Sequence, residues 1–278
     1  MEIKNILVPT DFSLTASYGL EMARKLSETH GANIHLLYIV ETAGDTVFET
    51  DGTLKDQCTE YNVEGLLKEA EISRQRFREQ LEGETDNLRC EVAIGPFKNT
   101  VLSFIDKHQI DLVVMPTAGA TGFKDWFSNS RAGLITSIAP VPVLTLKCDR
   151  SDSAFRHLMV GGDYSTAAPT DLEMLLTIQK HFNSKLHLVH INTSSNWLTT
   201  RRAERLMLKY AADHRLQNFE AHVYCDESVE QGLKHFAEDR MVDMIAVKNK
   251  KSIYDRLLKT DLARNMVNHV FFPVLTIN

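Results

Sequence analysis

Residues 33–40, NIHLLYIV, and residues 185–192, KLHLVHIN, are two versions of one segment rich in branched apolar residues. A short apolar run of this kind is typical of a strand that is buried on both faces of a sheet. The same offset along the chain places Asp11 of PTDFS on Asp163 of GGDYS. The strand and the motif before it are therefore repeated together.

Two later landmarks recur in the same order. DLVVM at 111–115 matches DMIAV at 243–247, and VPVLT at 141–145 matches FPVLT at 272–276. A period of about 140 residues is the size of a whole domain, so the sequence indicates duplication of a domain and not a solenoid of small repeats.

The landmarks predict two domains, residues 1–147 and residues 154–278, joined by a short polar stretch. The spacing between landmarks is longer in the first domain, because residues 41–62 form a polar insertion after the second strand. We interpret this insertion as an extra loop, which either closes over a ligand as a lid or is plain surface.

Strand and helix patterns alternate in each half. Ser13 is predicted to cap the first helix and Gly31 to stop it. The second half repeats this with Ser165 as cap and with Leu172, Leu175 and Leu176 on the buried stripe. Alternating units of this length predict an α/β fold with two doubly wound parallel-sheet domains. The strands expected in the first half are 3–9, 34–40, 88–94, 112–116 and 141–146.

Composition narrows the function classes. The 278 residues include 43% hydrophobic and 24% charged residues, and the net charge is −6, so no overall field attracts nucleic acid or an anionic membrane. No stretch approaches the length of about 20 apolar residues that a membrane span requires, and no signal peptide is evident. We expect a cytoplasmic protein with no membrane partner.

Four motifs together resemble the universal stress protein family, and their duplication resembles its tandem members. They are ILVPTDFS at 6–13, HLLYIV at 35–40, DLVVMPTAGATGF at 111–123 and PVPVLTL at 140–146. The resemblance implies a Rossmann-like sheet with strand order 3-2-1-4-5 in each domain. It also implies that the final strands of two domains lie against each other.

The resemblance further implies an adenine-nucleotide site, with ATP and Mg²⁺ as the cofactors. ATP-binding members carry G-x2-G-x9-G-[ST] after the fourth strand, and here those positions read Pro116, Gly119, Asn129 and Ser130. Proline has no N–H to offer a phosphate, whereas asparagine tolerates the left-handed backbone that glycine adopts. Neither half therefore carries an intact loop.

The first strand supplies the other half of this expected site. Asp11, with Pro9 and Thr10 before it, matches the family's nucleotide-contacting acid, and Val40 is expected to line the base. The alternative is that Asp11 only bonds the neighbouring turn and that Gly119 only shapes its loop.

The second half departs further from the family's pattern, because its aligned loop, residues 248–261, contains no glycine. The loop instead carries Lys248, Lys250 and Lys251. This cluster could hold an anion or an acidic partner, but a short basic run is usually solvated surface, and we do not expect nucleic-acid binding.

No residue is predicted to be catalytic. The sequence lacks the GxSxG, Walker and HExxH motifs, so weak ATP hydrolysis is the most that we expect. His35 and His187 occupy the same place in the two repeats, which suggests a structural slot. His187 and His190 should face opposite sides of their strand, so no metal shared by that pair is expected.

Two functions follow from these features. The first is a non-catalytic stress-response or regulatory module whose two domains pair within one chain through their final strands. The alternative is an ATP-binding switch that uses the first domain only. A homodimer and an unidentified protein partner remain open in both.

Overall fold

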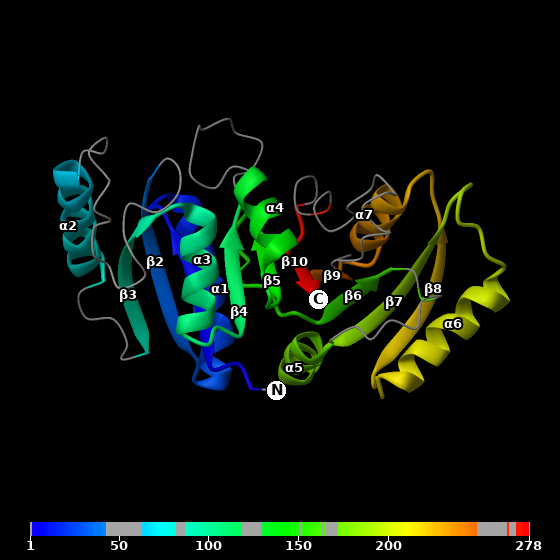
Figure 1. Ribbon diagram of the computed structural model, residues 1–278. Helices are drawn as coiled ribbons and strands as arrows, with labels where there is room; N and C mark the ends of the chain where they lie inside the picture. Colours follow the sequence, from blue (N-terminus) through cyan, green and yellow to red (C-terminus); the bar gives the residue numbers. More distant parts are fainter. Residues whose placement is uncertain are drawn as a thin grey trace. The chain divides into compact units, whose positions relative to one another are not determined.

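The computed structural model describes residues 2–42, 63–81, 87–117, 129–150, 152–162, 164, 172–248, 266 and 271–277. These residues form two compact units. One unit is Ile3–Met115, and the other is Pro116–Asn278 together with the first two residues. Each unit is built from strands that alternate with helices (Figure 1).

The unit Ile3–Met115 is a parallel sheet with the strand order β3-β2-β1-β4. Figure 1 shows α1 and α3 on opposite faces of these strands. The elements are β1 (Asn5–Thr10), α1 (Leu14–His30), β2 (Asn33–Glu41), α2 (Val63–Gln80), β3 (Leu88–Gly95), α3 (Phe97–Lys107) and β4 (Leu112–Pro116).

Helix α1 begins and ends at the residues that the sequence predicted. The Ser13 side chain accepts a hydrogen bond from the Ala16 N–H, which satisfies one of the free donors in the first turn. Gly31 ends the helix in the left-handed conformation, at φ 62°, and its N–H donates to the Ser27 carbonyl. A residue with a side chain would be strained there, so the glycine fixes where the helix stops.

The unit Pro116–Asn278 has the strand order β5-β10-β9-β6-β7-β8. The pairing of β5 with β10 is antiparallel and the other pairings are parallel. The elements are α4 (Asn129–Ile138), β5 (Val143–Leu146), β6 (His157–Gly161), α5 (Glu173–Phe182), β7 (Lys185–Asn192), α6 (Thr200–Asp213), β8 (Phe219–Cys225), α7 (Val229–Asp239), β9 (Met244–Lys248) and β10 (Val274–Ile277).

The expected strand order is present. Strands β6 to β10 reproduce the order 3-2-1-4-5 in full, and β1 to β4 reproduce its first four strands. The fifth strand of the first repeat is β5, the neighbour of β4 in the sheet. The N–H of Thr117, just after β4, donates to the carbonyl of Leu146 at the end of β5. The fold class predicted from the sequence is thus confirmed.

The compact units do not divide where the repeats do. The first unit ends at Met115, and β5, which pairs with β10, lies in the unit that contains the second repeat. The domain bounds 1–147 and 154–278, drawn from the repeat, stay a prediction. Of the predicted insertion 41–62, residues 43–62 lie outside the described residues.

Helix α5 departs from the predicted pattern. Leu172 and Leu175 are buried as expected, but Leu176 is only half-buried, and Met174 and Ile178 complete the buried stripe. The predicted cap Ser165 lies outside the described residues. The predicted stripe is therefore correct at Leu172 and Leu175 and wrong at Leu176.

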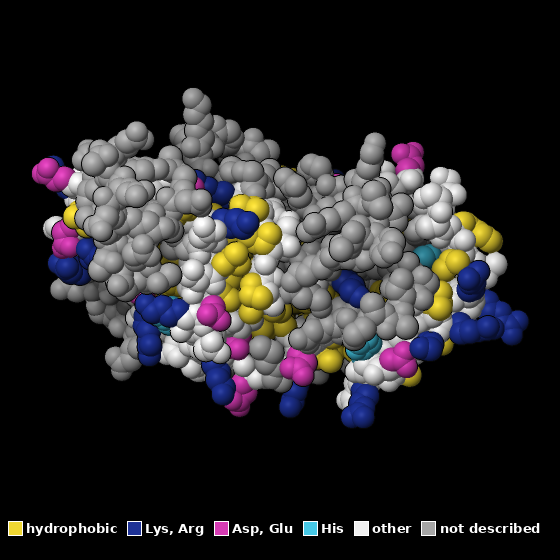
Figure 2. All heavy atoms as spheres, in the orientation of Figure 1, with side chains coloured by type: hydrophobic (Ala, Val, Ile, Leu, Met, Phe, Trp, Pro, Cys, Tyr) yellow, Lys and Arg dark blue, Asp and Glu magenta, His cyan; other side chains and the backbone are white. Residues whose placement is uncertain are grey.

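Helix α6 is amphipathic. Its buried residues Ala203, Met207 and Ala211 recur every fourth position, which places them on one face. Basic side chains gather over this helix in Figure 2, and Arg201 and Arg202 are among its exposed residues.

No helix in the described part of the chain is long and apolar enough to span a bilayer.

Strand β6 and helix α7 approach closely at a glycine. A β-carbon added to Gly161 would lie 2.5 Å from Cδ2 of Leu233, whose side chain is fully buried on α7. A β-carbon added to the next residue, Gly162, would meet nothing within 4 Å. The two neighbouring glycines therefore form a matched pair, one packed and one open.

We expect Gly161→Ala to destabilise the protein by about 1–3 kcal/mol, because the buried Leu233 cannot move without disturbing the core. Gly162→Ala should change the free energy of unfolding by less than about 0.5 kcal/mol. Urea unfolding of both variants tests this. Equal stability of the two variants would show that the approach of α7 is not tight.

Candidate functional site

The carboxyl ends of β1 and β2 bring together four of the residues predicted for a nucleotide site. Pro9 and Thr10 end β1 opposite Leu37 and Tyr38 of β2, and both are buried. Asp11 follows directly and is half-buried. Val40 lies two residues beyond Tyr38 on β2 and is 1% exposed.

The turn after β1 is held by its own side chains. Phe12 has a φ of 62°, in the left-handed region, and its N–H donates to Oγ1 of Thr10 at 3.1 Å. One carboxylate oxygen of Asp11 accepts from the Ser13 N–H at 2.9 Å. The contact of Asp11 with its neighbouring turn, which the sequence left as an alternative, is therefore present. Among the described residues, its second carboxylate oxygen accepts no hydrogen bond.

An aromatic cluster fixes this turn from one side, and sequence reasoning missed it. The ring of Phe12 lies 5.0 Å from that of Tyr38 and 4.8 Å from that of Phe77 on α2, measured between centroids. The guanidinium of Arg76 lies 5.8 Å from the Phe12 centroid, within cation–π range. Phe12 meets α2 from a left-handed backbone, which is uncommon for a bulky residue and which no sequence pattern predicts.

A hollow of about 380 Å³ opens beside the same turn. Its lining is apolar apart from Thr10, two serines and a glutamine, and it includes Phe12, Leu20 and Leu36 but neither Asp11 nor Val40. The hollow is therefore not the predicted nucleotide site, although both begin at the end of β1.

The remaining predicted residues belong to the other compact unit. Pro116 is the buried last residue of β4, and Asn129 and Ser130 are the first residues of α4. Gly119 lies outside the described residues. A helix start is where backbone N–H groups gather for an anion, so the position of Asn129 and Ser130 is compatible with the expected loop.

Comparison with known proteins gives the family of this fold. The family model described as "Universal stress protein family" matches residues 2–147. The chain belongs to the universal stress protein family. The resemblance that the sequence motifs suggested is thereby confirmed.

Individual relatives agree with the family model. Two universal stress proteins of Methanocaldococcus jannaschii are 25% identical over 144 residues and 22% identical over 161 residues. Each alignment covers 52% of this chain, and they cover 82% and 94% of the relatives.

Solved structures extend the likeness in fold to both repeats. A universal stress protein from Archaeoglobus fulgidus matches with a TM-score of 0.69 and 18% identity, over 99% of this chain and 96% of the other. A functionally unknown protein from Pseudomonas aeruginosa matches with a TM-score of 0.61 and 13% identity, over 99% and 92%.

The second repeat of this universal stress protein holds a row of three histidines. Nδ1 of His157 lies 3.1 Å from Nε2 of His187, and Nδ1 of His187 lies 3.0 Å from Nε2 of His222. His187 is 3% exposed. A neutral imidazole has one donor and one acceptor, so the neutral His187 ring satisfies both neighbours. The slot that the sequence assigned to His187 is indeed buried, but its partners were not foreseen.

Burial lowers the pKa of His187 to about 4, and His222 and His157 add to the shift. Because the folded pKa lies below the unfolded value, protonation favours the unfolded chain. The stabilisation is full above about pH 6.5 and falls as the pH drops toward 4.

We expect the free energy of unfolding to fall by about 1–2 kcal/mol between pH 7 and pH 5 through this group alone. His187→Gln should remove that part of the pH dependence. Urea unfolding at pH 7, 6 and 5 measures both slopes. Identical slopes for the variant and the wild type would show that His187 does not titrate in this range.

Proposed function

We propose that this universal stress protein is a non-catalytic, cytoplasmic stress-response module whose two repeats are joined within one chain through their final strands. One observation carries the proposal, which is the antiparallel ladder between β5 and β10. Val274, Leu275 and Thr276 lie opposite Thr145, Leu144 and Val143.

The ladder removes two sheet edges at once. All four residues of β5 and all four of β10 are buried, so neither strand offers its backbone to another molecule. The Oγ1 of Thr145 also donates to the carbonyl of Val274, at 3.3 Å. A contact that repeated domains make in trans would leave two chains bound together, whereas the same contact in cis leaves the chain's other surfaces for partners.

A cysteine pair tests whether the contact is made in cis. Opposed residues of an antiparallel ladder have Cα separations of about 4.5–5.5 Å, within the range for a disulfide. We expect Thr145→Cys with Val274→Cys to form a disulfide within a single chain. Peptide mapping with intact-mass measurement should find the crosslink at the mass of one chain.

Pairing Thr145→Cys with Ile277→Cys provides the control, because Ile277 has no partner on β5 and should form little of this bond. A disulfide between positions 145 and 274 that is found only at the mass of two chains would overturn pairing in cis and support a dimer exchanged through these strands.

The second candidate function is adenine-nucleotide binding by the first repeat, as the resemblance implies. The position of Asp11 favours it. The carboxylate lies at the carboxyl end of β1, where parallel sheets bind ligands, and one of its oxygens has no hydrogen-bond partner among the described residues. A ribose hydroxyl could donate to that oxygen.

Calorimetric titration with ATP and Mg²⁺ tests this function. We expect saturable binding by the wild type and affinity at least about tenfold weaker in Asp11→Ala, since a hydrogen bond to a charged group contributes about 1.5–3 kcal/mol. Gly119→Val should also weaken binding if the loop approaches the phosphates.

Asp163→Ala is the matched control, because Asp163 is the counterpart of Asp11 in the repeat whose loop has no glycine. Its affinity should equal that of the wild type. Absence of heat at millimolar ATP would exclude the nucleotide function and leave the proposed module unaffected.

A further inference from the structure

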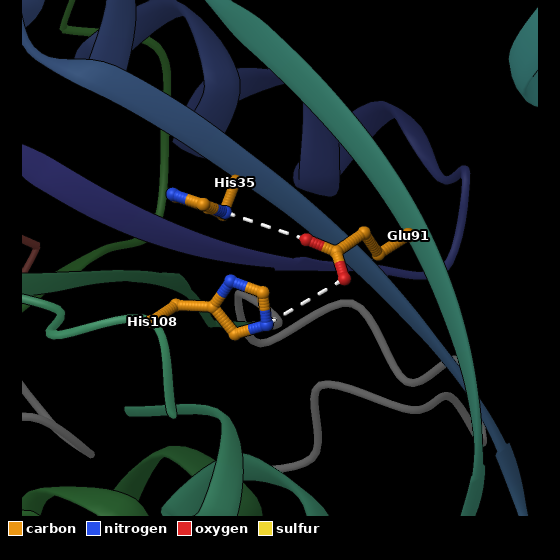
Figure 3. Close-up of side chains that lie close together, drawn as sticks. All are labelled: His35, Glu91 and His108. Atoms are coloured by element: carbon orange, nitrogen blue, oxygen red, sulfur yellow. Dashed lines mark hydrogen bonds and ion pairs between the residues drawn. The ribbon is translucent and has the colours of Figure 1, made fainter. Parts of the chain in front are cut away.

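Three side chains of the first repeat converge from three elements. His35 comes from β2, Glu91 from β3, and His108 is the residue that ends α3 (Figure 3). Nδ1 of His35 lies 3.5 Å from one carboxylate oxygen of Glu91, and Nε2 of His108 lies 3.6 Å from the other. One ligand atom from each residue lies within 4.8 Å of the other two.

These separations are longer than those of a charge-assisted hydrogen bond, which are about 2.7–2.9 Å. Ligand atoms at about 2.0–2.2 Å from a tetrahedral Zn²⁺ are separated by about 3.3–3.6 Å. The two distances are close to this separation, although they run to the two different oxygens of Glu91, so the spacing of the three groups is compatible with one metal ion between them.

The three side chains leave some of their hydrogen-bonding atoms without a partner among the described residues. Nε2 of His35 and Nε2 of His108 are buried, and neither has a hydrogen-bond partner among the described residues. The ring of His35 is 2% exposed, so little solvent is available to take the place of the missing partner. Glu91 contributes the negative charge that a divalent ion requires.

The ring of His108 is held in place before any ligand arrives. It stacks on Phe104, one turn earlier in α3, with a centroid distance of 4.0 Å and an interplanar angle of 14°. His108 also lies at the carboxyl end of α3, where the helix dipole favours a cation. Both effects reduce the cost of bringing the three ligands to one ion.

The second repeat holds a related group, His187, Glu220 and His222, whose ligand atoms also lie within 4.8 Å of one another, but its surroundings differ. By the alignment that pairs Asp111 with Asp243, Phe104 and His108 correspond to Phe236 and Arg240. The guanidinium of Arg240 lies 5.9 Å from the Phe236 centroid, so a permanent cation replaces the stacked imidazole. A positive charge at this position opposes a bound metal ion.

The buried histidine also has different hydrogen-bond partners in the two repeats. His187, the counterpart of His35, has both ring nitrogens at hydrogen-bond distance from other histidines. The carboxylate of Glu220 is paired with Lys185 at 2.5 Å. In the second repeat the buried histidine is therefore bonded to two other histidines and the glutamate is paired with a lysine, whereas in the first repeat the glutamate lies between two histidines.

We propose that His35, Glu91 and His108 form a binding site for one divalent transition-metal ion of the Zn²⁺ class. Two imidazoles and a carboxylate are a ligand set that Zn²⁺ accepts, with water in the fourth position. His108 and Glu91 are partly exposed, which gives that water access to solvent. The bound ion would tie the end of α3 to β2 and β3.

The test uses the untagged full chain after removal of metal with a chelator. Zn²⁺ is titrated in competition with a chromophoric chelator, and we expect one ion per chain at the competed site. Glu91→Gln and His108→Gln each remove one ligand and should weaken binding by at least about 10- to 100-fold, the loss typical of changes even in the outer shell. His222→Gln is the matched control in the other repeat and should bind as the wild type does.

Two further measurements keep the result interpretable. Far-ultraviolet circular dichroism establishes that the variants are folded, which we expect because Glu91 and His108 are partly exposed. Co²⁺ added to the metal-free wild type should give the visible absorption of a tetrahedral ion, and that absorption should be lost in both folded variants.

Loss of binding in His222→Gln with retention in His108→Gln would overturn the proposal and place the metal in the second repeat. Absence of stoichiometric binding by the wild type would also overturn it. Arg89 is an exposed cation opposite His35 on β3, so Arg89→Gln should tighten binding about twofold through the loss of a weak repulsion.

Discussion

Alternation along β2 directs successive side chains of one buried strand toward two different sets of helices. The backbone of β2 is fixed between β1 and β3, so its register cannot shift without moving every side chain to the other face. Tyr38 faces the turn after β1 and meets Phe12, whereas His35 faces α3 and meets His108. The proposed nucleotide and metal sites thus lie on opposite faces of the same strand.

Opposite faces make the two proposed sites separable in energy. No described residue belongs to both, and the substitutions that test one leave the ligands of the other in place. A coupling between them would have to pass through β2 itself, whose packed core resists small displacements. The simplest expectation is that the affinities for nucleotide and for metal are additive.

The two repeats place a buried histidine at the same position but surround it with different side chains. His35 and His187 occupy the same place on the second strand of each repeat, and both are nearly inaccessible. One difference is the residue that ends the helix after the third strand, which is His108 in one repeat and Arg240 in the other. An imidazole beside a carboxylate offers a ring nitrogen to a metal ion, whereas a guanidinium does not, so a change at one helix end alters what the buried histidine can bind together with its neighbours.

The sequence predicted what depends on neighbours along the chain. The cap at Ser13, the stop at Gly31 and the strands were found, because caps and apolar runs are local signals. The strand order came from the resemblance to the family and not from such signals. The cluster of His35, Glu91 and His108 was missed, since three elements and a register are needed to bring it together. The only signal for it was weak, namely a histidine retained at the same place in both repeats.

The nucleotide site illustrates the same distinction between local and long-range information. Sequence comparison identifies Pro116 as a position without an N–H, but the structure adds that the next donor is also used, because the Thr117 N–H is bonded to Leu146. The last residue of β4 and the residue after it therefore have no free backbone N–H to offer a phosphate. Backbone contacts from the loop after β4 to a phosphate would therefore have to come from residues after Thr117, and the proposed site depends the more on Asp11 and the end of β2.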